Sequence, residues 1–271
     1  MAFVLTNSER QQWFDGLLIP AVEAYNVSAA FVTTKTGIDA KVITIPGVGA
    51  ITVSTYDGTD MTVSNVADAK VDVALDQAKY TNSAVESTDN FNSFMNVIPE
   101  VTDRTADAIA DVIDTYTFGQ LSSATNIVTG GTALTVATIA AFIGSLKVKL
   151  NQLKAPRAGR KLALPSDVAD LLAQAQIGSG SDSIATEAGR TGYVTTYGGF
   201  DIYESQNLAS ATTGVWGIAC VDTGAVMGIG YNEARVKELE GRFADAVQTL
   251  VNYGAKVIKQ EFVVKADVAV A

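Results

Sequence analysis

Apolar and polar residues alternate with a different period in successive parts of this 271-residue chain. Residues 1–38 carry short apolar patches that are interrupted by Gly16, Pro20 and Gly37. This pattern predicts an arm with a short helix around residues 8–18, which packs on another surface and does not form a domain of its own.

Residues 39–80 predict an extended β-hairpin. β-Branched runs occupy residues 41–45, 50–55 and 70–75, with turn residues at 46–49 and at Asp57. The segment is rich in Thr and Val but poor in large apolar side chains, so it needs a partner surface. An edge sheet within the same subunit and pairing with a neighbouring chain both satisfy this need; pairing with a neighbour is favoured.

Two helices are predicted in the middle of the chain. In the first, Val101, Ile109, Val112, Ile113 and Tyr116 share one face, opposite Asp103, Arg104, Asp107, Asp111 and Asp114. Pro99 either starts this helix or kinks a longer one, and Gly119 is expected to end it. The second is expected over residues 135–154, with Val136, Ile139, Phe142, Ile143, Leu146, Leu150 and Leu153 facing inward.

Shorter elements fill the rest of the chain. The pattern predicts a strand at 160–164, a helix from 165 to 172, a loop at 178–183, and strands at 200–203, 215–221, 225–229, 256–259 and 262–265. Because helices and strands are interleaved without a repeated βαβ unit, the predicted fold class is α+β.

Composition removes several classes of function. The chain has no histidine, one cysteine and a formal net charge of −10. Histidine-based catalysis and histidine or cysteine-rich metal sites are therefore excluded, and nucleic-acid binding through a basic face is disfavoured. Cys220 lies in an apolar run and is expected to be buried rather than reactive.

No motif for catalysis or cofactor binding is found, so we expect no enzymatic activity and no cofactor. A P-loop is absent, and residues 57–60 match only a fragment of a calcium loop. The N-terminus lacks a basic region before a long apolar run, so no secretory signal is expected. Residues 115–146 are uncharged, but Gly, Thr and Ser interrupt them, so an amphipathic helix is favoured over a membrane span.

Charge is unevenly distributed along the sequence. Six basic residues and no acid occur between 147 and 161 (Lys147, Lys149, Lys154, Arg157, Arg160 and Lys161), whereas residues 100–114 carry five acids and one arginine. These segments are either two solvated faces or complementary patches that meet within or between subunits, and both interpretations stay open.

Several groups of residues occur along the chain in the same order as in one known family. They are residues 40–49 with 51–53 and Tyr56; 73–80 with Val85 and 89–93; 150–156 with 159–165; 189–193 with 198–205; and 253–257. In this order they resemble the major capsid proteins of tailed bacteriophages, which have the Hong Kong 97-like fold. The likeness covers nearly the whole chain.

The resemblance implies an arm at residues 1–38, an extended hairpin (the E-loop) at 39–80, a peripheral domain with a long spine helix at 81–160 plus 235–271, and an axial domain at 161–234. It implies self-assembly, as hexamers and pentamers, into an icosahedral shell around the double-stranded DNA of a tailed phage. Scaffolding and portal proteins are the further partners it implies, with the virion, and the host cytoplasm during assembly, as the location. No membrane and no sequence-specific DNA binding are expected.

Candidate self-association residues lie in the hairpin and in the basic segment. They are Lys41, Pro46, Gly47, Tyr56, Asp57, Lys149 and Lys154. Some capsids of this family are joined by Lys–Asn bonds from the hairpin tip, but residues 56–61 contain no lysine, so a non-covalent shell is expected. An encapsulin-like compartment around enzyme cargo is the nearest alternative function, and a β-rich adhesive module is a more distant one.

Overall fold

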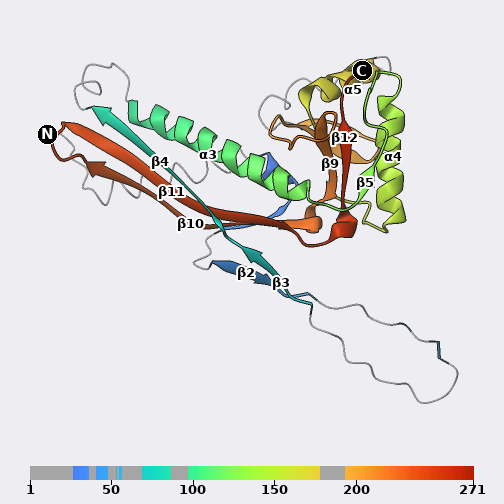
Figure 1. The fold of residues 1–271 in the computed structure, drawn as a ribbon, viewed down its shortest axis with the longest axis horizontal. Helices are drawn as coiled ribbons and strands as arrows, with labels where there is room; N and C mark the ends of the chain where they lie inside the picture. Colours follow the sequence, from blue (N-terminus) through green and yellow to red (C-terminus); the bar gives the residue numbers. More distant parts are fainter. Residues whose placement is uncertain are drawn as a thin grey trace.

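The computed structural model describes residues 27–36, 41–47, 53, 55–56, 69–86, 97–177 and 193–271. The fold is α+β, as predicted, and has two main sheets. The long sheet has the order β1–β10–β11–β4, formed by β1 (Thr33–Lys35), β10 (Ala225–Glu238), β11 (Ala244–Val257) and β4 (Gln77–Glu86). Helix α3 (Val97–Leu121) runs along it (Figure 1).

The second sheet has six strands in the order β5–β12–β9–β6–β8–β7. Its strands are β5 (Ile127–Val128), β6 (Arg160–Leu164), β7 (Tyr193–Tyr197), β8 (Phe200–Glu204), β9 (Val215–Val221) and β12 (Val263–Val268). Helices α4 (Ile139–Gln152) and α5 (Ser166–Ile177) share a core with one face of this sheet, through Leu146 of α4, Leu172 of α5 and Leu162 of β6.

The other face of the six-stranded sheet shares a core with the long sheet. Ile218 and Cys220 of β9 belong to the same buried cluster as Ile113 of α3 and Val251 of β11. The chain crosses between the sheets at η2 (Asp222–Gly224), between β9 and β10, and again at η3 (Gln260–Phe262), between β11 and β12. The Gly224 carbonyl oxygen ties these crossings together by accepting bonds from the Ile258 and Lys259 amides.

Helix α3 differs from its prediction in two ways. It continues through Gly119 to Leu121, because a glycine in a helix weakens it without ending it when the flanking residues are buried. The buried face of the helix is also rotated relative to the predicted face, since Asp114 is only 3% exposed while Val112 is 39% exposed. Asp114 is therefore not part of a solvated acidic face.

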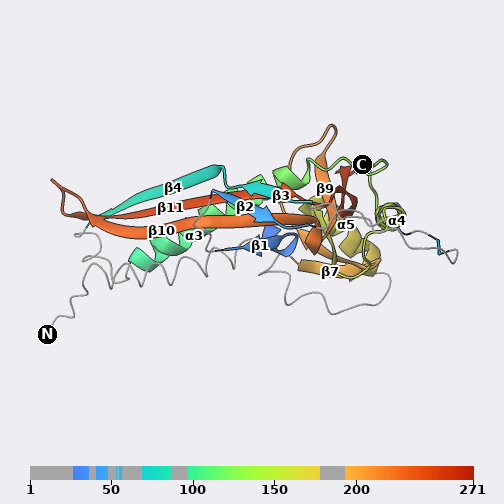
Figure 2. The same cartoon turned by 90° about the horizontal axis from the view of Figure 1, so that it is seen from below.

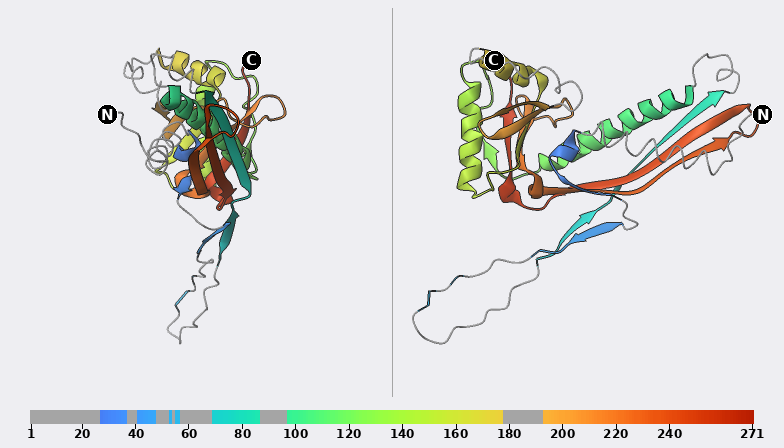
Figure 3. Two further views of the ribbon diagram at one scale, coloured as in Figure 1. Left: turned by 90° about the vertical axis from the view of Figure 1, so that its left-hand side faces the viewer. Right: turned by 180° about the vertical axis from the view of Figure 1, so that it is seen from behind.

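A third, two-stranded sheet consists of β2 (Val42–Ile45) and β3 (Val71–Ala74) alone. It lies beneath the long sheet, on the side opposite α3, with its base against β10 and β11 (Figures 1 and 3). The segment η1 (Ser28–Ala30) with β1 lies at the junction of the two main sheets (Figure 2).

Sheet membership cuts across the predicted domain limits. Strands β5 and β12 and helix α4 fall within the predicted peripheral ranges, 81–160 and 235–271, yet they belong with the six-stranded sheet. Strand β10 begins inside the predicted axial range, 161–234, yet pairs in the long sheet. Pairing between strands distant in sequence produces this difference, which contiguous ranges do not anticipate.

The helix expected at 8–18 and the loop expected at 178–183 lie outside the described residues, as does most of the β-branched run at 50–55. Within the described part of the chain, no helix combines the length and the hydropathy needed to cross a membrane.

Candidate functional site: the projecting hairpin and the arm segment

The β2–β3 pair is an antiparallel ladder whose two strands have no other strand partner among the described residues. Val42 lies opposite Ala74, and Ile45 lies opposite Val71. The ladder continues outward, because the Ala69 amide donates to the Gly47 carbonyl oxygen at 3.0 Å. At the inner end the Leu75 amide donates to the Lys41 carbonyl oxygen at 2.8 Å. The outer edge of β2 has no strand partner among the described residues and is open to a further strand, whereas the outer side of β3 contacts β11, where Lys256 donates to the Asp72 carbonyl oxygen.

Three of the candidate residues of the hairpin, Lys41, Pro46 and Tyr56, lie where a partner could reach them. Lys41 and Pro46 are exposed, Tyr56 is 70% exposed, and Gly47 is half-buried against residue 69. Asp57 lies outside the described residues. The backbone carbonyl oxygens of Lys41 and Gly47 are thus hydrogen-bonded within the chain, while the side chains of Lys41 and Tyr56 face solvent.

The arm segment, residues 27–35, is wedged between the two main sheets. Phe31 is fully buried, and its ring meets Phe118 of α3 edge-on at 5.6 Å and Tyr203 of β8 at 5.2 Å between ring centroids. Beyond it, β1 pairs in parallel with β10, with Thr33 opposite Val226. The segment therefore contacts both sheets at once.

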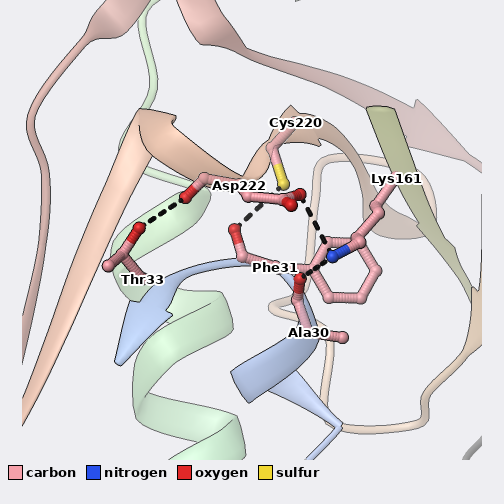
Figure 4. Close-up of polar contacts among 6 residues, drawn as sticks. All are labelled: Ala30, Phe31, Thr33, Lys161, Cys220 and Asp222. Atoms are coloured by element: carbon pink, nitrogen blue, oxygen red, sulfur yellow. Dashed lines mark hydrogen bonds and ion pairs between the residues drawn. The ribbon is translucent and has the colours of Figure 1, made fainter. Parts of the chain in front are cut away.

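Polar contacts fix the backbone of the same segment (Figure 4). Lys161 of β6 donates to the Ala30 carbonyl oxygen at 2.6 Å and forms an ion pair with Asp222 at 3.1 Å. The Cys220 thiol donates to the Phe31 carbonyl oxygen at 3.4 Å, and the Thr33 hydroxyl donates to the Asp222 carbonyl oxygen at 3.2 Å. The arm segment is thus bonded to the crossing at η2.

Asp114 holds the start of η1 from the other side. Its buried carboxylate accepts the backbone amides of Val27 at 3.0 Å and Ser28 at 2.9 Å. Burial raises the pKa of this carboxyl above its usual value, against the lowering effect of the bonds from Ser28 and Val27. The protonated carboxyl is therefore favoured more in the folded than in the unfolded protein.

We expect Asp114→Ala to destabilise the subunit at all pH values, because it leaves two amides at a buried position without their acceptor. Since the folded-state pKa is raised, the wild-type carboxyl contributes most below its unfolded value of 3.8, and that contribution is lost as the pH rises through the folded pKa. The difference in unfolding free energy between wild type and variant should therefore be larger at acidic than at neutral pH, as measured by urea unfolding. A difference that shrinks on acidification would contradict this.

The basic segment is split by the fold. Arg160 is buried and bonds to Pro156, Ala155 and Asn151, and Lys161 is used at the arm segment. Neither is available for a patch. Lys149, half-buried in α4, and Lys154, exposed just after α4 with a φ of 58°, have no ion-pair partner among the described residues.

Among the described residues, no three Cys, Asp or Glu side chains gather as a metal site. Cys220 is fully buried, as predicted, and burial raises the pKa of its thiol. The thiol is therefore an inert donor within the core.

The sequence patterns did not reveal the structural role of Asp114. They also did not reveal that Gly228 of β10 and Gly254 of β11 lie opposite each other. Glycine within a strand signals the close approach of another backbone, and this signal was available at both positions.

Comparison with known proteins agrees with these features. A family described as phage capsid protein matches residues 70–266. No curated protein matches the sequence.

Solved structures with a similar fold include that of Mycobacterium phage Che8, at 24% identity and a TM-score of 0.68, covering 84% of this chain and 85% of that chain. The capsid of cyanophage P-SCSP1u is similar at 15% identity and a TM-score of 0.68, covering 91% of this chain and 88% of that chain. The capsid of a native GTA particle is similar at 11% identity and a TM-score of 0.66, with 90% of each chain covered. Because the family match spans well over half of the sequence and the fold is that of phage capsids, this chain belongs to the phage capsid protein family and has the Hong Kong 97-like fold.

Proposed function

We propose that copies of this major capsid protein join through the β2–β3 hairpin, each hairpin lying on the next subunit, to build an icosahedral shell of hexamers and pentamers around double-stranded DNA. The role is structural, and we propose no catalytic step. An encapsulin-like compartment is not favoured, because the matching family is that of phage capsids.

One observation carries this proposal: the β2–β3 ladder has no further strand partner among the described residues, and the chain beyond it carries exposed apolar side chains. A two-stranded ladder in water is marginal by itself and gains stability when a third strand or a face covers it. Exposed apolar side chains follow the hairpin outward, with Val42 46%, Val53 92% and Tyr56 70% exposed. A second copy supplies the missing surface by adding strand or side-chain contacts.

The second proposed contact between copies is electrostatic. Lys149 and Lys154, with the exposed Lys147 and Arg157, are the basic residues of this segment that remain after Arg160 and Lys161 are used internally. Asp103 and Asp107 remain exposed on α3. We propose that these groups set the register between copies, an effect that acts on encounter and orientation more than on affinity.

We also propose a revised division of the subunit. The long sheet with α3 would form the peripheral domain, and the six-stranded sheet with α4 and α5 would form the axial domain at the centre of each hexamer or pentamer. The net charge of −10 suits a wall that does not hold packaged DNA by its phosphates. Scaffolding and portal proteins are proposed as assembly partners in the host cytoplasm.

The test is a hairpin truncation designed on the existing ladder. Residues 48–68 are replaced by Asn-Gly, a two-residue turn, because the Gly47 and Ala69 backbones are already hydrogen-bonded across the hairpin. We expect the wild type to form closed shells by negative-stain microscopy and sedimentation. The truncated protein should stay as single subunits or small oligomers with an unchanged unfolding temperature.

Shells formed equally well by the truncated protein would overturn the proposal. Wild-type shells boiled in SDS should yield single subunits, because the hairpin contact is expected to be non-covalent. A ladder of higher-mass bands would contradict that expectation.

A further inference from the structure

The base of the hairpin crosses the long sheet at two glycines. Gly228 of β10 and Gly254 of β11 are direct cross-strand partners, and both are buried. Neither has a positive φ, so backbone conformation does not require glycine at these positions. Glycine inside a strand usually weakens a sheet, so its presence twice in one pair points to a need for space.

The space is occupied by the hairpin. A β-carbon on Gly254 would collide with the Ala74 carbonyl oxygen and lie 3.0 Å from the Leu75 α-carbon, both of them backbone atoms. A β-carbon on Gly228 would instead meet the ends of the Ile43 and Leu75 side chains. The two glycines therefore form a flat seat, in which Gly254 touches hairpin backbone and Gly228 touches movable side chains.

The seat lies on the face of the long sheet that α3 does not cover. Met227 and Tyr253, the sequence neighbours of the two glycines, are buried in the same core cluster as Ile113 of α3. Because alternate residues of a strand point to opposite faces, Gly228 and Gly254 present bare backbone on the other side. The hairpin base packs against this side of the sheet, and its Val73 side chain is fully buried.

Two ties hold the hairpin base on this seat. Lys256, two residues beyond Gly254, donates from its Nζ to the Asp72 carbonyl oxygen at 2.9 Å. The Tyr116 hydroxyl of α3 donates to the Asp76 carboxylate at 2.9 Å. Burial, followed by this bond to Asp76, raises the pKa of Tyr116 to about 12. One tie comes from the sheet and the other from the helix, so rotation of the hairpin about the seat is restrained on two sides.

We propose that the Gly228–Gly254 seat sets the direction in which the hairpin leaves the subunit, and that Gly254 is a positioning residue for assembly. A side chain at Gly254 moves the backbone of residues 74–75 and so re-aims everything beyond it. The effect on assembly rests on the proposed function, because a re-aimed hairpin misses the next copy. The effect on the direction of the hairpin does not.

The experiment compares three substitutions. G254A introduces a clash with hairpin backbone, and G228A introduces a clash only with side-chain ends. G214A is the matched control, because its β-carbon would collide with the backbone oxygen of Val268 in the six-stranded sheet, away from the hairpin. Hairpin direction is measured in unassembled subunits by electron spin resonance, as the distance between spin labels at V53C and F243C. Both positions are 92% exposed, and the buried Cys220 stays unlabelled.

We expect G254A to shift the label distance and to lower the yield of shells from unlabelled protein by ~100-fold, since misaimed contacts lose the gain of multivalency. G228A should shift the distance less, and G214A should leave it unchanged even where it lowers the unfolding temperature. An unchanged label distance in G254A, or an equal shift in G214A, overturns the proposal that the seat sets the direction of the hairpin. A shifted distance with a normal yield of shells supports the seat and overturns the hairpin contact proposed above.

Discussion

Replacing Phe31 by alanine is expected to lower the free energy of unfolding of the subunit by about 3–5 kcal/mol. The ring is fully buried and lies edge-on to Phe118 and Tyr203, so its removal leaves a cavity between the two main sheets. Urea unfolding of unassembled subunits measures the loss. Phe243→Ala is the control, because that ring is 92% exposed and its removal should change the free energy by no more than ~0.5 kcal/mol.

The same substitution should also release the arm segment locally. Thr33, Thr34 and Lys35 pair with β10 directly after the turn that Phe31 anchors, so their amides should exchange with solvent faster in the variant. Equal losses of stability in Phe31→Ala and Phe243→Ala, or unchanged exchange at β1, would show that the arm segment does not hold the sheets together.

Replacing Arg160 by alanine is expected to cost about 3 kcal/mol of unfolding free energy, because it removes three charge-assisted bonds and leaves the buried Ala155 carbonyl oxygen without its donor. The guanidinium donates to the carbonyl oxygens of Pro156 at 2.7 Å and Ala155 at 2.8 Å and to the Asn151 amide oxygen at 2.9 Å. These bonds fold the loop after α4 back onto the first residue of β6.

Arg157→Ala is the matched control for that prediction. Arg157 lies in the same loop, is exposed and has no ion-pair partner among the described residues, so its loss should change the free energy by no more than ~0.5 kcal/mol. If thermal and urea unfolding give equal effects for the two arginines, Arg160 is not the structural residue that its contacts indicate.

Local patterns predicted the elements that are apolar along their length. Strand β9 was predicted at its observed limits, 215–221, because it is buried on two faces and is a continuous apolar run. Strand β6 was also predicted at its limits, 160–164, although Arg160 and Lys161 precede its apolar residues. Helix α4 is shorter than predicted, because Val136 is 40% exposed and precedes the first turn. Five of the residues predicted to face inward do face the core: Ile139, Phe142, Ile143, Leu146 and Leu150.

The long polar strands could not be predicted in the same way. Strand β4, with its Gln, Lys, Asn and Ser residues, has one partner strand and an exposed edge, so its sequence lacks an apolar face. Burial of Asp114 depends on two amides that lie 86 and 87 residues away in sequence, a pairing that no local period contains. The hairpin was recognised because its composition is unusual; its seat was not, because the two glycines acquire meaning only when β10 and β11 are paired.

The seat at Gly254 also has a consequence for synthesis. During translation the hairpin, at residues 41–75, leaves the ribosome long before β11, at Ala244–Val257, which supplies both Gly254 and the partner of β4. A nascent chain therefore holds a hairpin without its seat until Val257 has emerged, because the pairing of β4 with β11 joins segments that lie far apart in the sequence.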